Sequence, residues 1–208
     1  MYQTFPPSAG SDPWVTTQRA TMLSAVSTLT AFQELKPGDN SYGATVATAA
    51  TNDAAQVGGG VSNAAGAYKA FSASIFQTPK TTGWGIAFRC IVPTPVAAKF
   101  VGFGLVNAAA NHDVTFASYN TISTTNYVID ITGGATTTVD SGVAINTAMA
   151  DYVLTCDATT LKLFRNGALV TSTTTLTNLA DEPMFPALFG TDVNTAKLVR
   201  ILYGYIAP

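Results

Sequence analysis

A histidine beside an aspartate, His112-Asp113, is the pair in this sequence whose residue types most directly suggest chemistry. An imidazole titrates near neutral pH, and a neighbouring carboxylate can orient it as a general base. Adjacent residues seldom turn their side chains toward each other, however, and the sequence has no nucleophile signature such as G-x-S-x-G. We therefore expect His112 to be an exposed loop residue without a catalytic role.

Paired carboxylates are the second arrangement that could carry out a reaction, because glycoside hydrolysis uses two of them on either side of the scissile bond. Glu34 and Glu182 are the only glutamates, and Glu182 follows Asp181, so on a strand these two side chains would point to opposite faces. Other aspartates lie near predicted strand ends and turns, where Asx turns account for them: Asp130, Asp140, Asp151, Asp157 and Asp192. The sequence thus predicts that the chain is not an enzyme.

The loop NAAANHDV, residues 107–114, comes nearest to a cation site, with Asn111 and Asp113 as the candidate ligands. Calcium takes about six to eight oxygen ligands and usually more than one carboxylate. A single loop aspartate is better explained as a turn cap. We predict no metal and no cofactor, while a calcium site assembled from several distant loops stays open.

Cys90 and Cys156 lie in separate strand-like segments with no histidine nearby, so they cannot form a zinc site. We expect two reduced, buried thiols rather than a disulfide, because the chain shows no sign of export. The first residues, MYQTFPPSAGSDPW, lack both the basic start and the apolar core of a signal peptide. This absence predicts synthesis in a host cytoplasm without export.

Charge is scarce along the chain, since charged residues make up 11% and the net charge is −2. The ten Lys and Arg residues are scattered singly, so no basic stripe exists to neutralise phosphates, and we do not expect nucleic-acid binding. The longest apolar region, residues 91–110, is interrupted by prolines, Lys99 and glycines and does not read as a membrane span.

Residues 1–14 are predicted to form an extended arm with no core of its own, because prolines and a glycine punctuate the segment. Phe5, Pro6, Pro7 and Trp14 are its apolar anchors. Aromatic side chains in such an arm suggest that it lies against something, either its own domain or a neighbouring subunit. We assign these four residues to partner binding.

Residues 15–67 form a lead-in segment that is ambiguous between helix and strand. Met22, Val26, Leu29 and Phe32 recur at helical spacing, and the turn signal at residues 36–39 would end such a helix. Residues 43–67 are rich in Ala, Thr, Gly and Asn, and their glycine run lacks the Lys-Ser or Lys-Thr of a phosphate-binding loop. One short helix followed by a surface loop is the prediction.

From residue 68 onward, strand-length segments rich in Val, Ile, Phe, Tyr and Thr alternate with Gly, Asn, Asp and Pro. The segments are 69–77, 83–92, 99–107, 113–119, 126–132, 143–146, 151–157, 160–165, 168–175 and 197–206. Asn166-Gly167 is the strongest turn signal, because both positions of a type I′ turn need positive φ. The predicted fold is an all-β, antiparallel sandwich over residues 68–208, with 15–208 as the alternative extent of the domain.

Three stretches resemble a known family. MADYVLTCDATTLKLFRNGALVTSTTT, residues 149–175, resembles the central hairpin of the concanavalin A-like and laminin-G-like jelly rolls. GWGIAFRCIVP, residues 83–93, is similar to an earlier core strand, and LVRILYGYIAP, residues 198–208, to the closing strand. The resemblance implies a jelly roll. It does not imply one function, because this fold hosts lectins, glycosidases, adhesion modules and virion proteins.

The glucanase branch of this family carries acidic residues on one strand, often as Glu-x-Asp-x-Glu, and this sequence lacks that arrangement. A lectin-like role would instead need exposed aromatic rings that stack on sugars. Tyr119 and Tyr127 flank the loop NTISTTN and are the candidate glycan contacts.

The sequence favours a non-enzymatic structural protein of a bacteriophage virion, namely a capsid decoration or cement subunit. Such a subunit would bind the major capsid protein or other virion subunits and form a homo-oligomer in the particle, since large interfaces with few charges suit permanent assembly. The alternative is a carbohydrate-binding module of a phage tail fibre or spike that binds surface glycans. Shaft repeats and heptads, which a fibre would add, are missing.

Overall fold

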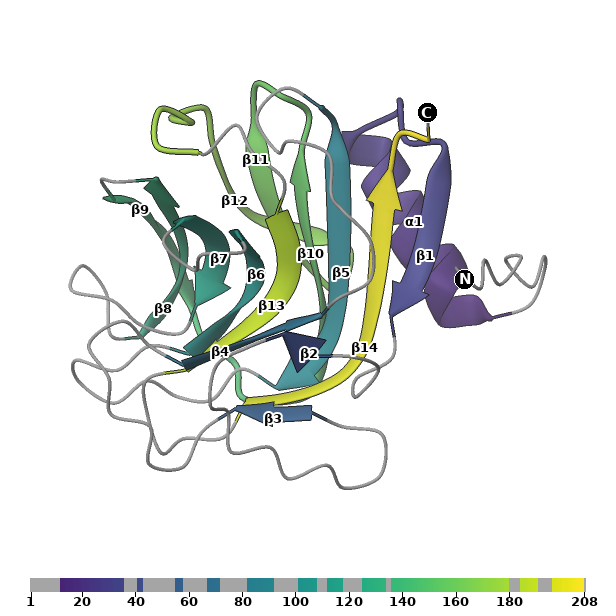
Figure 1. The fold of residues 1–208 in the computed structure, drawn as a ribbon. Helices are drawn as coiled ribbons and strands as arrows, with labels where there is room; N and C mark the ends of the chain where they lie inside the picture. Colours follow the sequence, from purple (N-terminus) through teal and green to yellow (C-terminus); the bar gives the residue numbers. More distant parts are fainter. Residues whose placement is uncertain are drawn as a thin grey trace.

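The structure is a computed structural model that describes residues 12–35, 41–42, 55–57, 67–71, 82–91, 101–107, 112–117, 125–133, 136–179, 184–190 and 196–207. Within these residues the chain forms two seven-stranded antiparallel sheets and one α-helix (Figure 1). The predicted all-β sandwich is therefore confirmed.

Sheet A has the strand order β1-β14-β5-β10-β11-β12, and β3 also pairs with β14. Its strands are β1 (Ala31–Leu35), β3 (Ala55–Val57), β5 (Trp84–Ile91), β10 (Ala150–Cys156), β11 (Leu161–Arg165), β12 (Ala168–Thr173) and β14 (Ala196–Tyr205). Residues from the predicted lead-in segment thus pair directly with the strand predicted to close the sandwich.

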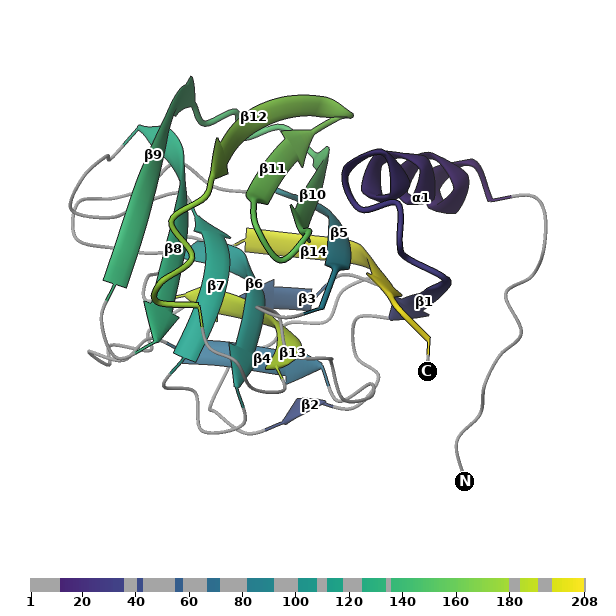
Figure 2. The ribbon, with the colours of Figure 1, turned by 90° about the horizontal axis from the view of Figure 1, so that it is seen from above.

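Sheet B has the strand order β2-β4-β13-β6-β7-β8-β9. Its strands are β2 (Ser41–Tyr42), β4 (Ala67–Phe71), β6 (Val101–Asn107), β7 (His112–Ala117), β8 (Asn126–Gly133), β9 (Thr136–Ala144) and β13 (Met184–Gly190). The two sheets face each other, and the helix lies on the far side of sheet A (Figures 1 and 2).

The period of two along each strand builds the core between the sheets. Tyr152, Leu154 and Cys156 of β10 all point into this core, on the one face that the sequence predicts for them. From the opposite sheet, Phe103 packs on Phe88 with 5.5 Å between the ring centroids. Interdigitated apolar side chains of this kind are the main favourable term in holding two sheets together.

Both cysteines are buried and free, in line with the expectation of two reduced thiols. Cys90 lies opposite Ala150 and Cys156 opposite Trp84, at the two ends of the β5–β10 ladder, so they cannot form a disulfide with each other. Burial raises the pKa of both thiols, that of Cys156 to about 11.

Helix α1 (Pro13–Ala25) begins with a capped first turn. The carboxylate of Asp12 accepts hydrogen bonds from the backbone N–H groups of Trp14 and Val15, at 2.9 and 3.4 Å. Pro13 suits this first turn, because its missing N–H would have no partner there. No helix in the described part of the chain is long and apolar enough to span a membrane.

The helix is shorter than the spacing of apolar residues predicts. It ends at Ala25, and Phe32, the last residue of the predicted stripe, lies on β1. The N–H of Thr30 donates to the carbonyl of Tyr205 at 3.0 Å, so the chain joins sheet A at this point. Pairing of this segment with β14 competes with a continuation of the helix. Val26, Ser27 and Thr28 are weak helix formers, so the helix ends and the strand forms.

A second apolar core fills the space between α1 and the outer face of sheet A. Its buried members are Trp14, Met22, Val26, Leu29, Ala87, Val153 and Leu202. The helix can approach closely because two strand positions beneath it are glycines: a Cβ on Gly85 would lie 2.9 Å from Met22 Cγ, and one on Gly204 would lie 3.0 Å from Met22 Sδ. The middle strands of sheet A are therefore buried on both faces.

The predicted tight turn between β11 and β12 is confirmed, since Asn166 has φ 48° and Gly167 has φ 80°. The hairpin then pairs Phe164 with Leu169. The register of the ladder shifts at this point, because Leu163 pairs with Thr171 and not with Val170.

Candidate functional site

Four polar side chains lie on the outer face of strands β8 and β9, and we call them the β8–β9 polar face: Asn126, Asp130, Thr138 and Asp140. Tyr127, Ile129 and Ile131 of β8 point into the core between the sheets, so the residues between them face outward. In the ladder, Asp130 pairs with Thr138 and Val128 with Asp140. The two carboxylates are thus diagonal neighbours on one face.

Hydrogen bonds hold both carboxylates in place. The Thr138 hydroxyl donates to Asp130 Oδ1 at 2.5 Å, and the Asn126 amide donates to Asp140 Oδ1 at 3.1 Å. Asp140 Oδ1 also accepts the backbone N–H of Gly142 at 2.8 Å, across a bend where Gly142 has φ 67°. Each carboxylate is therefore presented in a fixed orientation, with Asp130 half-buried and Asp140 exposed.

The neighbouring strands continue this face with small residue types. Asp130 pairs with Thr115 of β7, Thr115 pairs with Gly104 of β6, and Gly104 pairs with Ala187 of β13. A row of Ala, Gly, Thr, Asp and Thr across five strands has no bulky residue type in it. Ionised carboxylates accept hydrogen bonds and can also act as acids and bases, so this face can bind hydroxyl-rich molecules.

Sequence reasoning missed this face because it assigned each aspartate to a turn. That assignment holds for Asp157, whose Oδ1 accepts the N–H groups of Thr159 and Thr160, and for the bond from Gly142 to Asp140. It is wrong for Asp130, which lies within β8. The signal was present in NYVIDIT, where alternation with Tyr127 and the two isoleucines puts Asp130 on the face away from the core.

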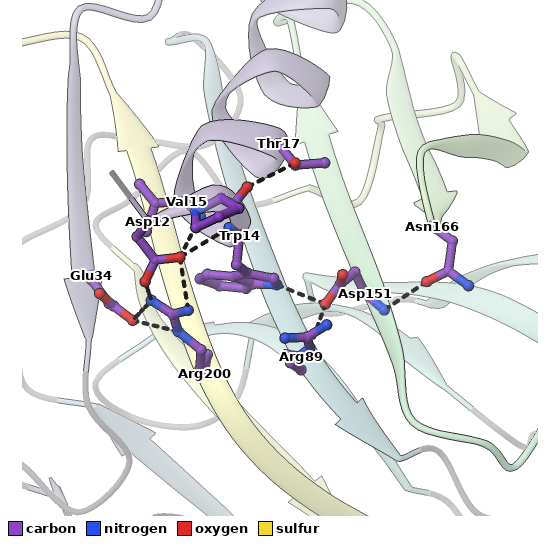
Figure 3. Close-up of polar contacts among 10 residues, drawn as sticks. Asp12, Trp14, Val15, Thr17, Glu34, Arg89, Asp151, Asn166 and Arg200 are labelled. Carbon is purple, nitrogen blue, oxygen red and sulfur yellow. Dashed lines mark hydrogen bonds and ion pairs between the residues drawn. The ribbon is translucent and has the colours of Figure 1, made fainter. Parts of the chain in front are cut away.

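A second polar cluster joins the start of α1 to sheet A, and we call it the α1 anchor: Asp12, Trp14, Glu34, Arg89, Asp151 and Arg200 (Figure 3). The indole of Trp14 lies between two charged groups. Its Nε1–H donates to Asp151 Oδ1 at 2.7 Å, and the Arg200 guanidinium lies over its ring with Cζ 4.3 Å from the centroid. Arg89 Nε lies 3.2 Å from the same Asp151 oxygen.

Arg200 connects three segments that are far apart in the sequence. Its guanidinium donates to Asp12 Oδ2 at 2.6 Å and to Glu34 Oε1 at 2.7 Å (Figure 3). The hydrogen bond from Arg200 lowers the pKa of Asp12 from its ordinary value of 3.8 to about 2. The Asp12 side chain is 42% exposed, so each of these ion pairs is worth little by itself. Together they fix where the arm leaves the sandwich.

Trp14 therefore does not belong to a free arm, as the sequence suggested. It is the second residue of α1 and is only 6% exposed, because its own sheet A covers it. The other predicted arm residues, Phe5, Pro6 and Pro7, lie outside the described residues.

Tyr127 was predicted to contact glycans, and its position in the structure contradicts this. Its ring is fully buried between the sheets, and its hydroxyl lies 3.0 Å from that of Tyr152. The N–H of Asn146 donates to the same hydroxyl at 2.9 Å, so Tyr127 satisfies its polar end internally. Burial raises the pKa of Tyr152 well above that of a free phenol. Tyr119, the other candidate, lies outside the described residues.

The candidate calcium ligands receive no support from the described residues. Asn111 lies outside them, and of Asp113 only the backbone is described, opposite Thr132 in the β7–β8 ladder. His112 begins β7, so it does not lie in a loop. No three His, Cys, Asp or Glu side chains in the described part of the chain come together in a way that could hold a metal ion.

Comparison with known proteins finds no matching family model and no matching curated protein. Solved structures do match. The Crh5 transglycosylase has a TM-score of 0.55 at 9% identity, over 86% of this chain and 85% of that chain. The endo-1,3-beta-glucanase of Streptomyces sioyaensis has a TM-score of 0.52 at 10% identity, over 85% and 90%. The alginate lyase AlyC3 has a TM-score of 0.51 at 10% identity, over 75% and 76%.

At 9–10% identity these likenesses establish the fold, and they agree with the resemblance to the concanavalin A-like jelly rolls. They also correct one prediction. The chain was predicted not to be an enzyme, whereas all three of these structures of the same fold are named as enzymes. The prediction looked for two carboxylates close together in sequence, and the fold instead brings Asp130 and Asp140 together from adjacent strands.

Proposed function

We propose that this protein binds a neutral glycan on the β8–β9 polar face. The observation that carries the proposal is the pair of carboxylates of Asp130 and Asp140, which lie on one outer face and are each held by a hydrogen bond from a neighbouring side chain. Sugar hydroxyls are donors that such carboxylates accept, and bonds to charged groups are the stronger ones.

The negative charge of the β8–β9 polar face favours a neutral glycan over an acidic one. Two carboxylates attract hydroxyl donors and repel a polymer that itself carries carboxylates, such as alginate. Val128, which lies on the same face between Asn126 and Asp130, is fully buried, so a sugar would meet this face at the carboxylates of Asp130 and Asp140. The three similar structures are named as an alginate lyase, an endo-1,3-beta-glucanase and a transglycosylase, which supports a glycan as the ligand class for this fold.

Binding can be measured by calorimetry with β-1,3-glucan oligosaccharides, N-acetylglucosamine oligosaccharides and oligoalginate. We expect a neutral oligosaccharide to bind and oligoalginate to bind less tightly. Asp130→Asn and Asp140→Asn should each weaken binding about ten- to hundredfold, since each loses a charge-assisted hydrogen bond. Asp157→Asn is the matched control, because Asp157 caps a turn of sheet A. Binding that all three variants retain unchanged would contradict the proposal.

The same samples answer whether binding leads to cleavage. Hydrolysis releases reducing ends, while a lyase product carries a new conjugated double bond that absorbs in the ultraviolet. Loss of turnover in Asp130→Asn or Asp140→Asn, with Asp157→Asn active, would place the reaction on this face.

We propose, as a second candidate, a subunit of a bacteriophage virion that attaches to the capsid through its N-terminal arm. The α1 anchor favours it, because Arg200 and Asp151 hold the root of the arm at a defined point of sheet A. Since Trp14 is part of the fold, the informative deletion removes residues 1–11 alone. Particle occupancy should fall after this deletion while the unfolding temperature stays the same, and unchanged occupancy would contradict the candidate.

A further inference from the structure

An apolar row crosses the outer face of sheet A and is only partly covered by α1. The ladder pairs Leu202 with Ala87, Ala87 with Val153, Val153 with Phe164, and Phe164 with Leu169. The first three residues are at most 1% exposed beneath the helix. Phe164 packs against the same core but is half-buried, and Leu169 is 56% exposed.

The uncovered end of this row carries no charge of its own. The segment 166–180 contains no Asp, Glu, Lys or Arg. Lys162, the preceding residue on that face of β11, is paired with Asp157, with 3.8 Å between Nζ and Oδ2. An exposed leucine that continues a buried row is the kind of surface that another apolar segment covers.

We propose that the arm of the same chain, residues 1–11, covers this surface and places Phe5 and Pro6 over Phe164 and Leu169. The arm has no charged side chain and holds two aromatic rings, those of Tyr2 and Phe5, and two adjacent prolines. A proline has a fixed φ, so a segment with two prolines loses less conformational entropy on docking than one without them.

The distances permit this placement. Asp12 is held by Arg200 on β14, and four strand spacings separate β14 from β12 in sheet A. Four spacings amount to about 19 Å. From Asp12 back to Phe5 there are seven residues, which span about 23–25 Å when extended. Phe5 can therefore just reach β12. For this reason we place Phe5 and its neighbour Pro6 on the surface, and not the residues nearer the start of the arm.

Docking of the arm on sheet A is independent of glycan binding on sheet B. It competes with the second candidate function, in which the same arm attaches to a capsid. It is tested in the full chain with the pair Thr4→Cys and Ser172→Cys, which keeps Phe5 and Leu169 in place, with oxidised glutathione as the oxidant. Ser172 is exposed and pairs with Lys162, on the outer face of sheet A. The native Cys90 and Cys156 are buried and stay out of the reaction. The matched control pairs Thr4→Cys with Val143→Cys, because Val143 is 41% exposed and lies on β9 of the other sheet.

We expect a disulfide within one chain to form at least about tenfold faster for Ser172→Cys than for Val143→Cys, because docking raises the effective concentration of the two thiols. Equal rates for the two pairs, or disulfides only between two chains, would overturn the proposal. The unfolding temperature of each reduced variant shows that it is folded.

Hydrogen exchange gives a second measurement without new thiols. The amides of residues 168–173 should exchange faster in Phe5→Ser than in the unaltered chain, whereas those of residues 141–144 should not change. Identical exchange at residues 168–173 would also overturn the proposal.

Discussion

The contact between Met22 and Gly85 can be tested by a double-mutant cycle. Met22 is fully buried between α1 and sheet A. The three atoms nearest to a Cβ on Gly85 would all belong to Met22, at 2.9 Å for Cγ, 3.0 Å for Sδ and 3.4 Å for Cβ. Gly85→Ala therefore overpacks the space that Met22→Ala would empty, and the two substitutions should compensate each other.

The magnitudes follow from burial. Met22→Ala should lower the free energy of unfolding by about 2–5 kcal/mol, because it leaves a cavity. Gly85→Ala should lower it by about 1–3 kcal/mol through overpacking. In the double variant the new methyl group fills part of the cavity, so its loss should be about 1–2 kcal/mol smaller than the sum of the single losses.

The assay is urea unfolding followed by far-ultraviolet circular dichroism, with equal m-values as the check on two-state behaviour. Gly204→Ala is the matched control, because its Cβ would meet Phe32 at 2.8 Å and Leu29 at 3.1 Å as well as Met22 at 3.0 Å. Removing Met22 relieves only one of those contacts, so the coupling should be smaller. Strict additivity of Met22→Ala and Gly85→Ala would refute the packing described for α1.

Three further predictions concern the pH dependence, the thiols and the turn. Arg200 lowers the pKa of Asp12 to about 2, so the stabilising effect of the Asp12 carboxylate is present above about pH 4 and is lost as the pH falls toward 2. In urea unfolding, the free energy of unfolding of the unaltered chain should therefore approach that of Asp12→Asn over this pH range. A difference that stays constant with pH would contradict the prediction. Cys90 and Cys156 are buried, so a thiol reagent at pH 8 should label neither in the folded chain and both in urea, as mass spectrometry can show. Gly167 has φ 80°, so Gly167→Ala should cost about 1–2 kcal/mol in the same unfolding assay, and an unchanged stability would mean that the turn relaxes.

Local signals in the sequence predicted the local parts of the fold. Asn166-Gly167 marked its turn because only a few residue types tolerate positive φ at both positions. The alternation in residues 151–157 correctly put Tyr152, Leu154 and Cys156 on one buried face. The family resemblance then supplied the jelly roll that connects these pieces.

What the sequence could not predict depends on contacts between distant residues. Arg200 meets Asp12, 188 positions away, so nothing near Trp14 indicated that the supposed arm residue would be buried. The helical stripe ended early because the competing partner was β14. Asp130 and Asp140 became neighbours only through the ladder of β8 with β9, which a search for adjacent carboxylates could not find.

The position of β14 constrains how the protein is made. Its residues, 196–205, lie between β1 and β5 in sheet A, so the first strand of that sheet to leave the ribosome has no neighbour until residues 196–205 have been translated as well. Helix α1 faces the same delay, because part of the surface beneath it belongs to β14. Closure of the sheet must therefore wait for residues 196–205, and a nascent chain stalled before residue 196 would expose its apolar strands to chaperones and proteases.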